Sequence, residues 1–155
     1  MTRKVDLNSD LGEGFGPWTM GDDAALLDIV TSANVACGVH AGDPDVMDKT
    51  MRTAIENGVG IGAHPGFADL KGFGRRQLPI PHDELANAVA YQLGAAQAMA
   101  KRAGGTVRHL KLHGALANMA SIDHALAKTC YQAALDVDPD IIIMVLAATA
   151  QEETT

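Results

Sequence analysis

The chain alternates short runs of β-branched and apolar residues with longer amphipathic segments, and this alternation is the strongest constraint on its fold. Strands are expected at residues 4–8, 33–37, 59–64, 106–112 and 141–147. Helices are expected between them, at residues 22–30, 44–57, 82–103 and 121–137. Alternation of this kind predicts an α/β fold, with a parallel sheet whose strands are joined by right-handed helical crossovers.

The length of the chain predicts a single domain over residues 1–155, because no linker or low-complexity segment divides it. A closed parallel barrel takes eight strands and about 250 residues, whereas five strands are expected here. Periodicity alone does not distinguish an open sheet from part of a barrel. If the parent fold is a barrel, we expect this chain to be truncated, with open strand edges that a homo-oligomer could cover.

Charge and composition exclude several classes of protein. The net charge of −7 disfavours general binding to nucleic acids or to anionic membranes. No apolar stretch approaches the roughly 20 residues of a membrane span, and the first ten residues lack the apolar core of a secretory signal. Cys37 and Cys130 are too few for a disulfide scaffold. We therefore expect a cytoplasmic protein that binds neither nucleic acid nor a membrane.

Polar residues follow each of the first four expected strands. In chain order they are Asn8, Asp10 and Glu13; His40 and Asp43; His64; and Lys111, His113 and Asn118. The carboxyl ends of parallel strands share one face of the sheet, and ligands bind there. These side chains are therefore expected to converge on one site, although they lie far apart in the sequence.

The residue types in this set suit metal binding and acid–base chemistry. Asp10, His40 and His64 offer oxygen and nitrogen ligands suited to a divalent cation such as zinc or manganese. Such an ion could polarise a carbonyl group or activate a water molecule. Lys111 and His113 alternate along a strand, so both can face one side and stabilise an oxyanion or carry a proton.

Glu13 and Asp43 are the further acid–base candidates, and Asn8, Arg75 and Asn118 are the candidates for substrate binding. Arg75 lies in the long loop at residues 65–81, which exceeds the usual connection length. It could hold an anion or simply be solvated.

Structural interpretations compete with these functional ones. His40 can be a satisfied core histidine, and Asp43, just before a proline, is a good helix cap. His82 and His124 stand at helix starts and are expected on the surface, and His109 can be purely structural.

Four motifs together resemble those of one protein family, in the same order and over essentially the whole chain. They are VDLNSDLGEGFGPWTMGDDAALL, VTSANVACGVHAGDP, GIGAHPGFADLKGFGRR and HLKLHGALAN. The chain is similar in these stretches to the family of the A subunit of 5-oxoprolinase, also called the LamB/YcsF or lactam utilisation family. The resemblance implies a distorted TIM-like (β/α) barrel of the glycoside hydrolase/deacetylase type. It also implies ATP-dependent opening of 5-oxoproline, a lactam, to L-glutamate, with ATP used through a complex with partner subunits B and C.

The family motifs fall on Asp6–Glu13, Cys37–Asp43, Gly62–Pro65 and Phe73–Arg75. Related deacetylase barrels bind a metal through one aspartate and two histidines. By analogy, this usage supports the set of Asp10, His40 and His64.

The chain also departs from the family pattern. Val39 stands where the family usually has phenylalanine, and Leu112 and Ala117 replace a proline and a tyrosine. The chain is also shorter than a full barrel. Two alternative functions therefore stay open: a metal-dependent hydrolase similar to polysaccharide deacetylases, and a non-catalytic, truncated binding subunit.

Overall fold

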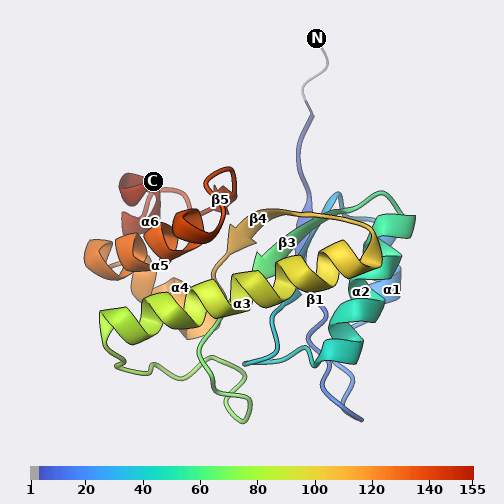
Figure 1. Ribbon diagram of the computed structural model, residues 1–155, viewed down its shortest axis with the longest axis horizontal. Coiled ribbons are helices and arrows are strands. Elements are labelled where there is room, and N and C mark those ends of the chain that lie inside the picture. Colours follow the sequence, from blue (N-terminus) through green and yellow to red (C-terminus); the bar gives the residue numbers. More distant parts are fainter. Residues whose placement is uncertain (1–3) are drawn as a thin grey trace.

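Five parallel strands form one sheet in the computed structural model, which describes residues 4–155 (Figure 1). The strands are β1 (Asn8–Leu11), β2 (Ser32–Ala36), β3 (Gly60–His64), β4 (Val107–Lys111) and β5 (Ile142–Met144). They lie side by side in the order in which they occur in the sequence. This order is that of a β/α barrel, whereas a doubly wound sheet reverses its order at a switch point. The predicted α/β class is confirmed, and the strand order is that of a TIM-like fold.

Helices follow the strands and cover one face of the sheet. They are α1 (Asp23–Leu27), α2 (Pro44–Glu56), α3 (His82–Ala103), α4 (Gly114–Ala120), α5 (His124–Val137) and α6 (Ala150–Thr154). The long helix α3 crosses in front of β3 and β4, with α2 on one side of it and α5 on the other (Figure 1). In residues 4–155, none of these helices combines the length and the apolar character that crossing a membrane requires.

The start of α2 shows how local sequence sets an element boundary. The Asp43 carboxylate accepts hydrogen bonds from the backbone N–H groups of Asp45 (2.9 Å) and Val46 (3.1 Å). Pro44 stands at the first helical position, where no intrahelical N–H bond is lost. The capping role predicted for Asp43 is confirmed.

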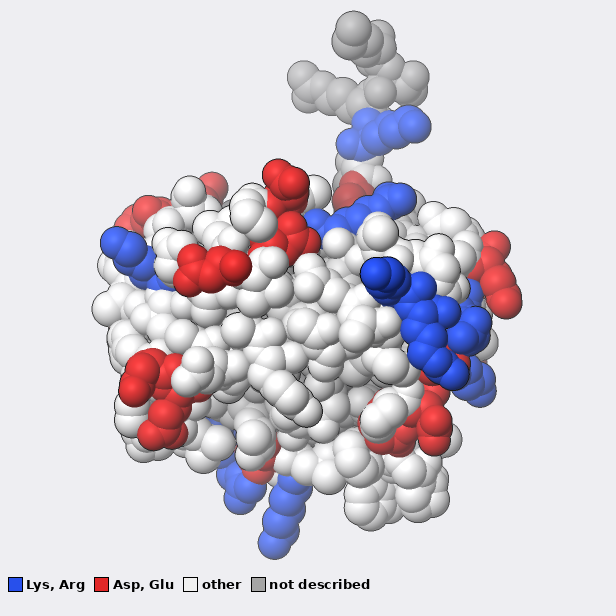
Figure 2. Space-filling view, in the orientation of Figure 1, with Lys and Arg blue, Asp and Glu red and all other residues white. Residues whose placement is uncertain are grey.

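Charged side chains help to fasten α2 to α3. Arg52 of α2 and Arg102 of α3 both pair with the carboxylate of Asp48. Figure 2 shows basic side chains gathered where the C-terminal end of α3 lies beside α2, whereas the middle of this face is largely uncharged.

The sheet has one apolar and one polar face because side chains alternate along each strand. Val35, Ile61 and Leu110 are buried in the core together with residues of the covering helices. The alternate positions carry Asn34, His64 and His109, which are also buried and form hydrogen bonds across the strands. The face opposite the helices is therefore lined with polar groups.

Several predicted boundaries are wrong. The first strand begins only at Asn8 and not at residue 4, because residues 4–7 are exposed and lie outside the sheet. The last strand is not buried along residues 141–147: only Ile142–Met144 pair, and Ile142 is 64% exposed at the edge of the sheet. Helices α4 and α6 are not predicted by the sequence pattern. Helix α6 begins after Thr149, whose side chain accepts a hydrogen bond from the backbone N–H of Gln151.

Candidate functional site

The carboxyl ends of four neighbouring strands bring together one carboxylate and three imidazole rings. Glu13 follows β1, His40 follows β2, His64 ends β3 and His113 follows β4. The three histidines are almost completely buried, with exposed fractions of 0%, 1% and 2%. We call these four side chains the imidazole cluster. The sheet gathers them because parallel strands end at a common edge.

The rings of the cluster pack in a fixed arrangement. His40 and His113 stack with their centroids 3.7 Å apart and their planes 5° from parallel. The ring of His64 stands at 86° to both. Backbone of the long loop closes the cluster at Gly74, where a Cβ atom would lie 2.9 Å from the side chains of both His40 and His113. Only glycine leaves the loop room to pack against these rings.

Two backbone carbonyl groups fix the proton positions on His64 and His113. His64 Nδ1 lies 2.7 Å from the carbonyl oxygen of Lys111, and His113 Nε2 lies 2.8 Å from that of Phe73. A carbonyl oxygen can only accept a hydrogen bond, so both of these nitrogens carry hydrogen. In the neutral rings, His64 Nε2 and His113 Nδ1 are therefore the free acceptors, and they face each other at 3.1 Å.

Glu13 contacts two of the rings. Its Oε1 atom lies 3.4 Å from His113 Nδ1 and 3.3 Å from His40 Nε2. The other ring nitrogen of His40, Nδ1, is buried and finds no hydrogen-bond partner within residues 4–155. Burial lowers the pKa values of both His40 and His113, and the neighbouring His40 lowers that of His113 further. Both rings are therefore neutral near pH 7.

Asp10 and Lys111 form an ion pair beside the cluster. Lys111 Nζ donates to Asp10 Oδ1 at 2.7 Å, and Asp10 Oδ2 lies 3.4 Å from His64 Nε2. Burial opposes ionisation of Asp10, but the hydrogen bond and the positive charge of Lys111 hold its pKa well below the ordinary value. This site thus holds an ionised carboxylate and an ammonium group within reach of the neutral rings.

Asn34 connects the polar side chains of three strands, and sequence reasoning missed it. Its buried amide nitrogen donates to Asp10 Oδ1 at 2.9 Å and to Asn8 Oδ1 at 2.8 Å. Its amide oxygen accepts from His109 Nε2 at 2.7 Å, so His109 is part of a network. The sequence does contain a signal for this role, since Asn34 is a polar residue inside the apolar run ANVAC. Burying an amide side chain without hydrogen-bond partners costs free energy, so partners are to be expected.

Three of the predicted site residues belong neither to the imidazole cluster nor to the adjoining network of Asn8, Asp10, Asn34 and Lys111. Both carboxylate oxygens of Asp43 accept hydrogen bonds from backbone N–H groups: Oδ1 from Asp45, and Oδ2 from Gly16. Arg75 is exposed in the long loop, with its guanidinium carbon 5.5 Å from the ring centroid of Phe73. Asn118 is exposed on α4. The structure therefore gives Asp43 a capping role and leaves Arg75 and Asn118 at the surface.

The potential metal ligands do not group as the sequence predicts. Within residues 4–155, Glu13, His64 and His113 are the set of three whose ligand atoms all lie within 4.8 Å of one another. Asp10 and His40 belong to the predicted set but not to this one. Asp10 is engaged by Lys111 and Asn34, and His40 turns Nε2 toward Glu13. The two imidazoles and one carboxylate fit the ligand preferences of zinc and similar cations.

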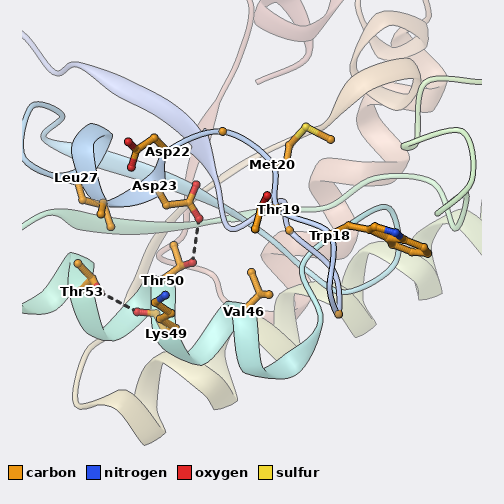
Figure 3. Close-up of a pocket in the computed structure, with 14 residues that line it drawn as sticks. Trp18, Thr19, Met20, Asp22, Asp23, Leu27, Val46, Lys49, Thr50 and Thr53 are labelled. Carbon is orange, nitrogen blue, oxygen red and sulfur yellow. Dashed lines mark hydrogen bonds between the residues drawn. The ribbon is translucent and has the colours of Figure 1, made fainter.

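A separate cavity of about 380 Å³ lies between the loop after β1 and helix α2 (Figure 3). Asp23 stands in its wall and accepts hydrogen bonds from the Gly12 N–H at 3.0 Å and from Thr50 Oγ1 at 3.3 Å. Burial raises the pKa of the Asp23 carboxyl group. These bonds anchor the loop that carries Glu13, so this wall supports the cluster from outside.

Comparison with known proteins identifies the family. The sequence model of the LamB/YcsF family matches residues 5–155. The chain belongs to the LamB/YcsF family. A relative in this family, the 5-oxoprolinase A subunit of Ruegeria pomeroyi, is 72% identical over 153 residues, which cover 99% of this chain and 60% of the relative. The protein of the same name from Rhodopseudomonas palustris (strain CGA009) is 58% identical over 145 residues, which cover 93% and 57%.

The LamB/YcsF fold is also shared with a solved structure. The lactam utilization protein from Thermus thermophilus superposes with a TM-score of 0.96 at 42% identity, over 98% of this chain and 62% of that chain. This chain spans about 60% of the length of the LamB/YcsF relatives it matches. The predicted family resemblance and fold class are confirmed.

Proposed function

We propose that this LamB/YcsF chain serves as the A subunit in the ATP-dependent opening of 5-oxoproline to L-glutamate, together with partner subunits B and C. The observation that carries the proposal is the name shared by its relatives, which is that of the 5-oxoprolinase A subunit, over nearly the whole of this chain. The name of the Thermus thermophilus protein, which refers to lactam utilization, agrees with a cyclic amide as substrate.

Opening a lactam breaks the ring C–N bond and adds one water molecule. The hydroxyl group of the water joins the carbonyl carbon, and its proton goes to the ring nitrogen, which becomes the amine of glutamate. In this proposal the Lys111 ammonium group stabilises the negative charge that develops on the carbonyl oxygen. Asp10 holds the lysine in position through their 2.7 Å ion pair.

Glu13 is the group that moves protons in this proposal. Its carboxylate accepts a proton from the attacking water and delivers it to the ring nitrogen, and His113, 3.4 Å from Glu13 Oε1, holds the carboxylate in position. Asp43 takes no part, since backbone N–H groups occupy its carboxylate. Asn8, Arg75 and Asn118 are proposed to contact the rest of the substrate, and ATP acts through the complex.

We place this activity in the cytoplasm. Cys37 and Cys130 are both buried free thiols, which suits a reducing compartment.

Reconstitution tests the proposal. The chain is mixed with purified subunits B and C, 5-oxoproline and ATP, and glutamate and ADP are measured. We expect glutamate only when all three proteins are present. Lys111→Met and Glu13→Gln should each lower the rate by about 100-fold or more, whereas His124→Ala, at an exposed site, should not. A full rate without this chain, or with Lys111→Met, would refute the proposal.

The two alternative functions give different results in the same series. A deacetylase would release acetate from a chitin oligomer without subunits B and C. A non-catalytic binding subunit would support a full rate even as Lys111→Met or Glu13→Gln. Either result would replace the lactam chemistry proposed for this site.

A further inference from the structure

We infer that Glu13, His64 and His113 together bind one divalent transition-metal cation, through Oε1, Nε2 and Nδ1 respectively. This inference goes beyond the proposed function, because it depends on the geometry of the cluster and not on which substrate the protein opens. The residues differ from the set that the sequence predicts, with which they share only His64.

The first argument is the direction of the ring nitrogens. The carbonyl oxygens of Lys111 and Phe73 take the N–H groups on the outer side of His64 and His113. The two inner nitrogens are thus left with lone pairs that face each other at 3.1 Å, and the Glu13 carboxylate lies 3.4 Å from one of them. Three electron-rich atoms this close repel one another unless a proton or a metal cation lies between them.

The second argument is the spacing of the ligand atoms. Zinc lies about 2.0–2.2 Å from nitrogen and carboxylate ligands, so two ligand atoms on one ion are separated by roughly 3–3.5 Å. The separations of 3.1 Å between the histidine nitrogens and 3.4 Å between His113 and Glu13 fall in this range. The third pair, Glu13 Oε1 and His64 Nε2, lies within 4.8 Å, so only this separation has to shorten for the three atoms to share an ion.

The third argument comes from the surrounding contacts. Histidines that bind metals almost always donate their other N–H to a carbonyl or carboxylate group, which fixes the tautomer and the ring orientation. Both His64 and His113 do so here. His40 supports the third ligand, because its Nε2 lies 3.3 Å from Glu13 and its ring stacks on His113. The cluster thus has outer contacts of the kind that support metal ligands.

Zinc titration of the full 155-residue chain, after treatment with EDTA, tests the inference. Calorimetry should show one Zn²⁺ ion bound per chain. Glu13→Gln, His64→Ala and His113→Ala should each weaken binding by more than the roughly 10- to 100-fold cost of losing an outer contact. His82→Ala and His124→Ala are matched controls at exposed histidines and should bind zinc as the unmodified chain does.

Asp10→Asn separates the two possible ligand sets. If Asp10→Asn abolishes binding and His113→Ala does not, the set is that of Asp10, His40 and His64, and the inference is wrong. Absence of zinc binding by the unmodified chain would also overturn it, and would leave a shared proton between His64 and His113 as the explanation of their contact.

Nuclear magnetic resonance of the unmodified chain provides a test that does not depend on variants folding. On addition of Zn²⁺, the ¹⁵N signals of His64 Nε2 and His113 Nδ1 should shift, while the opposite ring nitrogens keep their protons. Signals that shift at other histidines instead would contradict the inferred site. Because this readout needs no substrate, its failure is distinct from failure of the glutamate assay.

Discussion

The ring of His40 lies flat against the ring of His113, with 3.7 Å between their centroids. Neither ring is reachable from solvent, and both are neutral near pH 7 because burial lowers their pKa values. The stack joins the ends of β2 and β4, although β3 lies between these strands in the sheet. His40 therefore acts as a structural support for His113 and, through its Nε2 atom, for Glu13.

Substitution of His40 should separate packing from hydrogen bonding. His40→Ala leaves a cavity in the core and should lower the free energy of unfolding by about 2–4 kcal/mol. His40→Phe keeps a ring against His113 and removes the unpartnered Nδ1 atom, so its loss should stay below about 1.5 kcal/mol. Urea unfolding measures both values. Equal stability of the two variants would contradict a packing role for the ring.

Asn34 should be far more sensitive to substitution than an asparagine on the surface. Asn34→Ala removes three hydrogen bonds from a buried position and leaves His109 without its partner. We expect a loss of about 2–3 kcal/mol in the free energy of unfolding. Asn87→Ala, at an exposed position on α3, is the control and should change it by less than about 0.5 kcal/mol. A loss at Asn34 no larger than at Asn87 would refute the network.

Two glycines should respond to alanine in opposite directions. A Cβ atom at Gly62 would overlap the imidazole ring of His109, whereas a Cβ at Gly94 of α3 meets nothing within 4 Å. Gly62→Ala should therefore destabilise the protein by about 1–3 kcal/mol. Gly94→Ala should stabilise it by about 0.5–1 kcal/mol, because alanine favours the helix. Thermal unfolding would show the difference, and stabilisation by Gly62→Ala would contradict the close contact.

Asp69 should make the stability of the long loop depend on acid. The hydrogen bonds from Arg76 lower its pKa from 3.8 to about 2, and the Gly72 N–H assists. A carboxyl group whose pKa is lowered by folding stabilises the protein above its unfolded pKa, and the effect is lost as pH falls toward the folded value. The free energy of unfolding of the unmodified chain should therefore fall as the pH is lowered from about 4 to about 2. In Asp69→Asn this fall should be less steep. Identical pH profiles would exclude this contribution.

The sequence predicts the position of the cluster better than its bonding. Strand ends alone predict that Glu13, His40, His64 and His113 converge, because parallel strands share an edge. Which nitrogen of each ring faces inward depends on the carbonyl groups of Lys111 and Phe73, and no spacing rule predicts those contacts. The potential ligand set therefore differs from the one predicted.

Other differences have similar physical causes. The sequence pattern places Asn34 in an apolar strand. It does not predict the hydrogen bonds of Asn34, since the partners on β1 and β4 are distant in the sequence. Helix α4 follows β4 directly at Gly114, whose φ of 53° allows the sharp change of direction, and no turn-rich stretch marks its start. Long amphipathic segments such as α2 and α3 are predicted to within one residue, because their periodicity and caps are local.

The sequential order of the strands has a consequence for how the protein folds. The ion pair of Lys111 and Asp10 joins residues 101 positions apart, on strands β1 and β4, which have β2 and β3 between them in the sheet. Contacts that close such long loops carry a large entropy cost, so they form late in folding. A ligand that binds at the cluster recognises only the chain in which all four strands are assembled, and its binding energy draws the folding equilibrium toward that state.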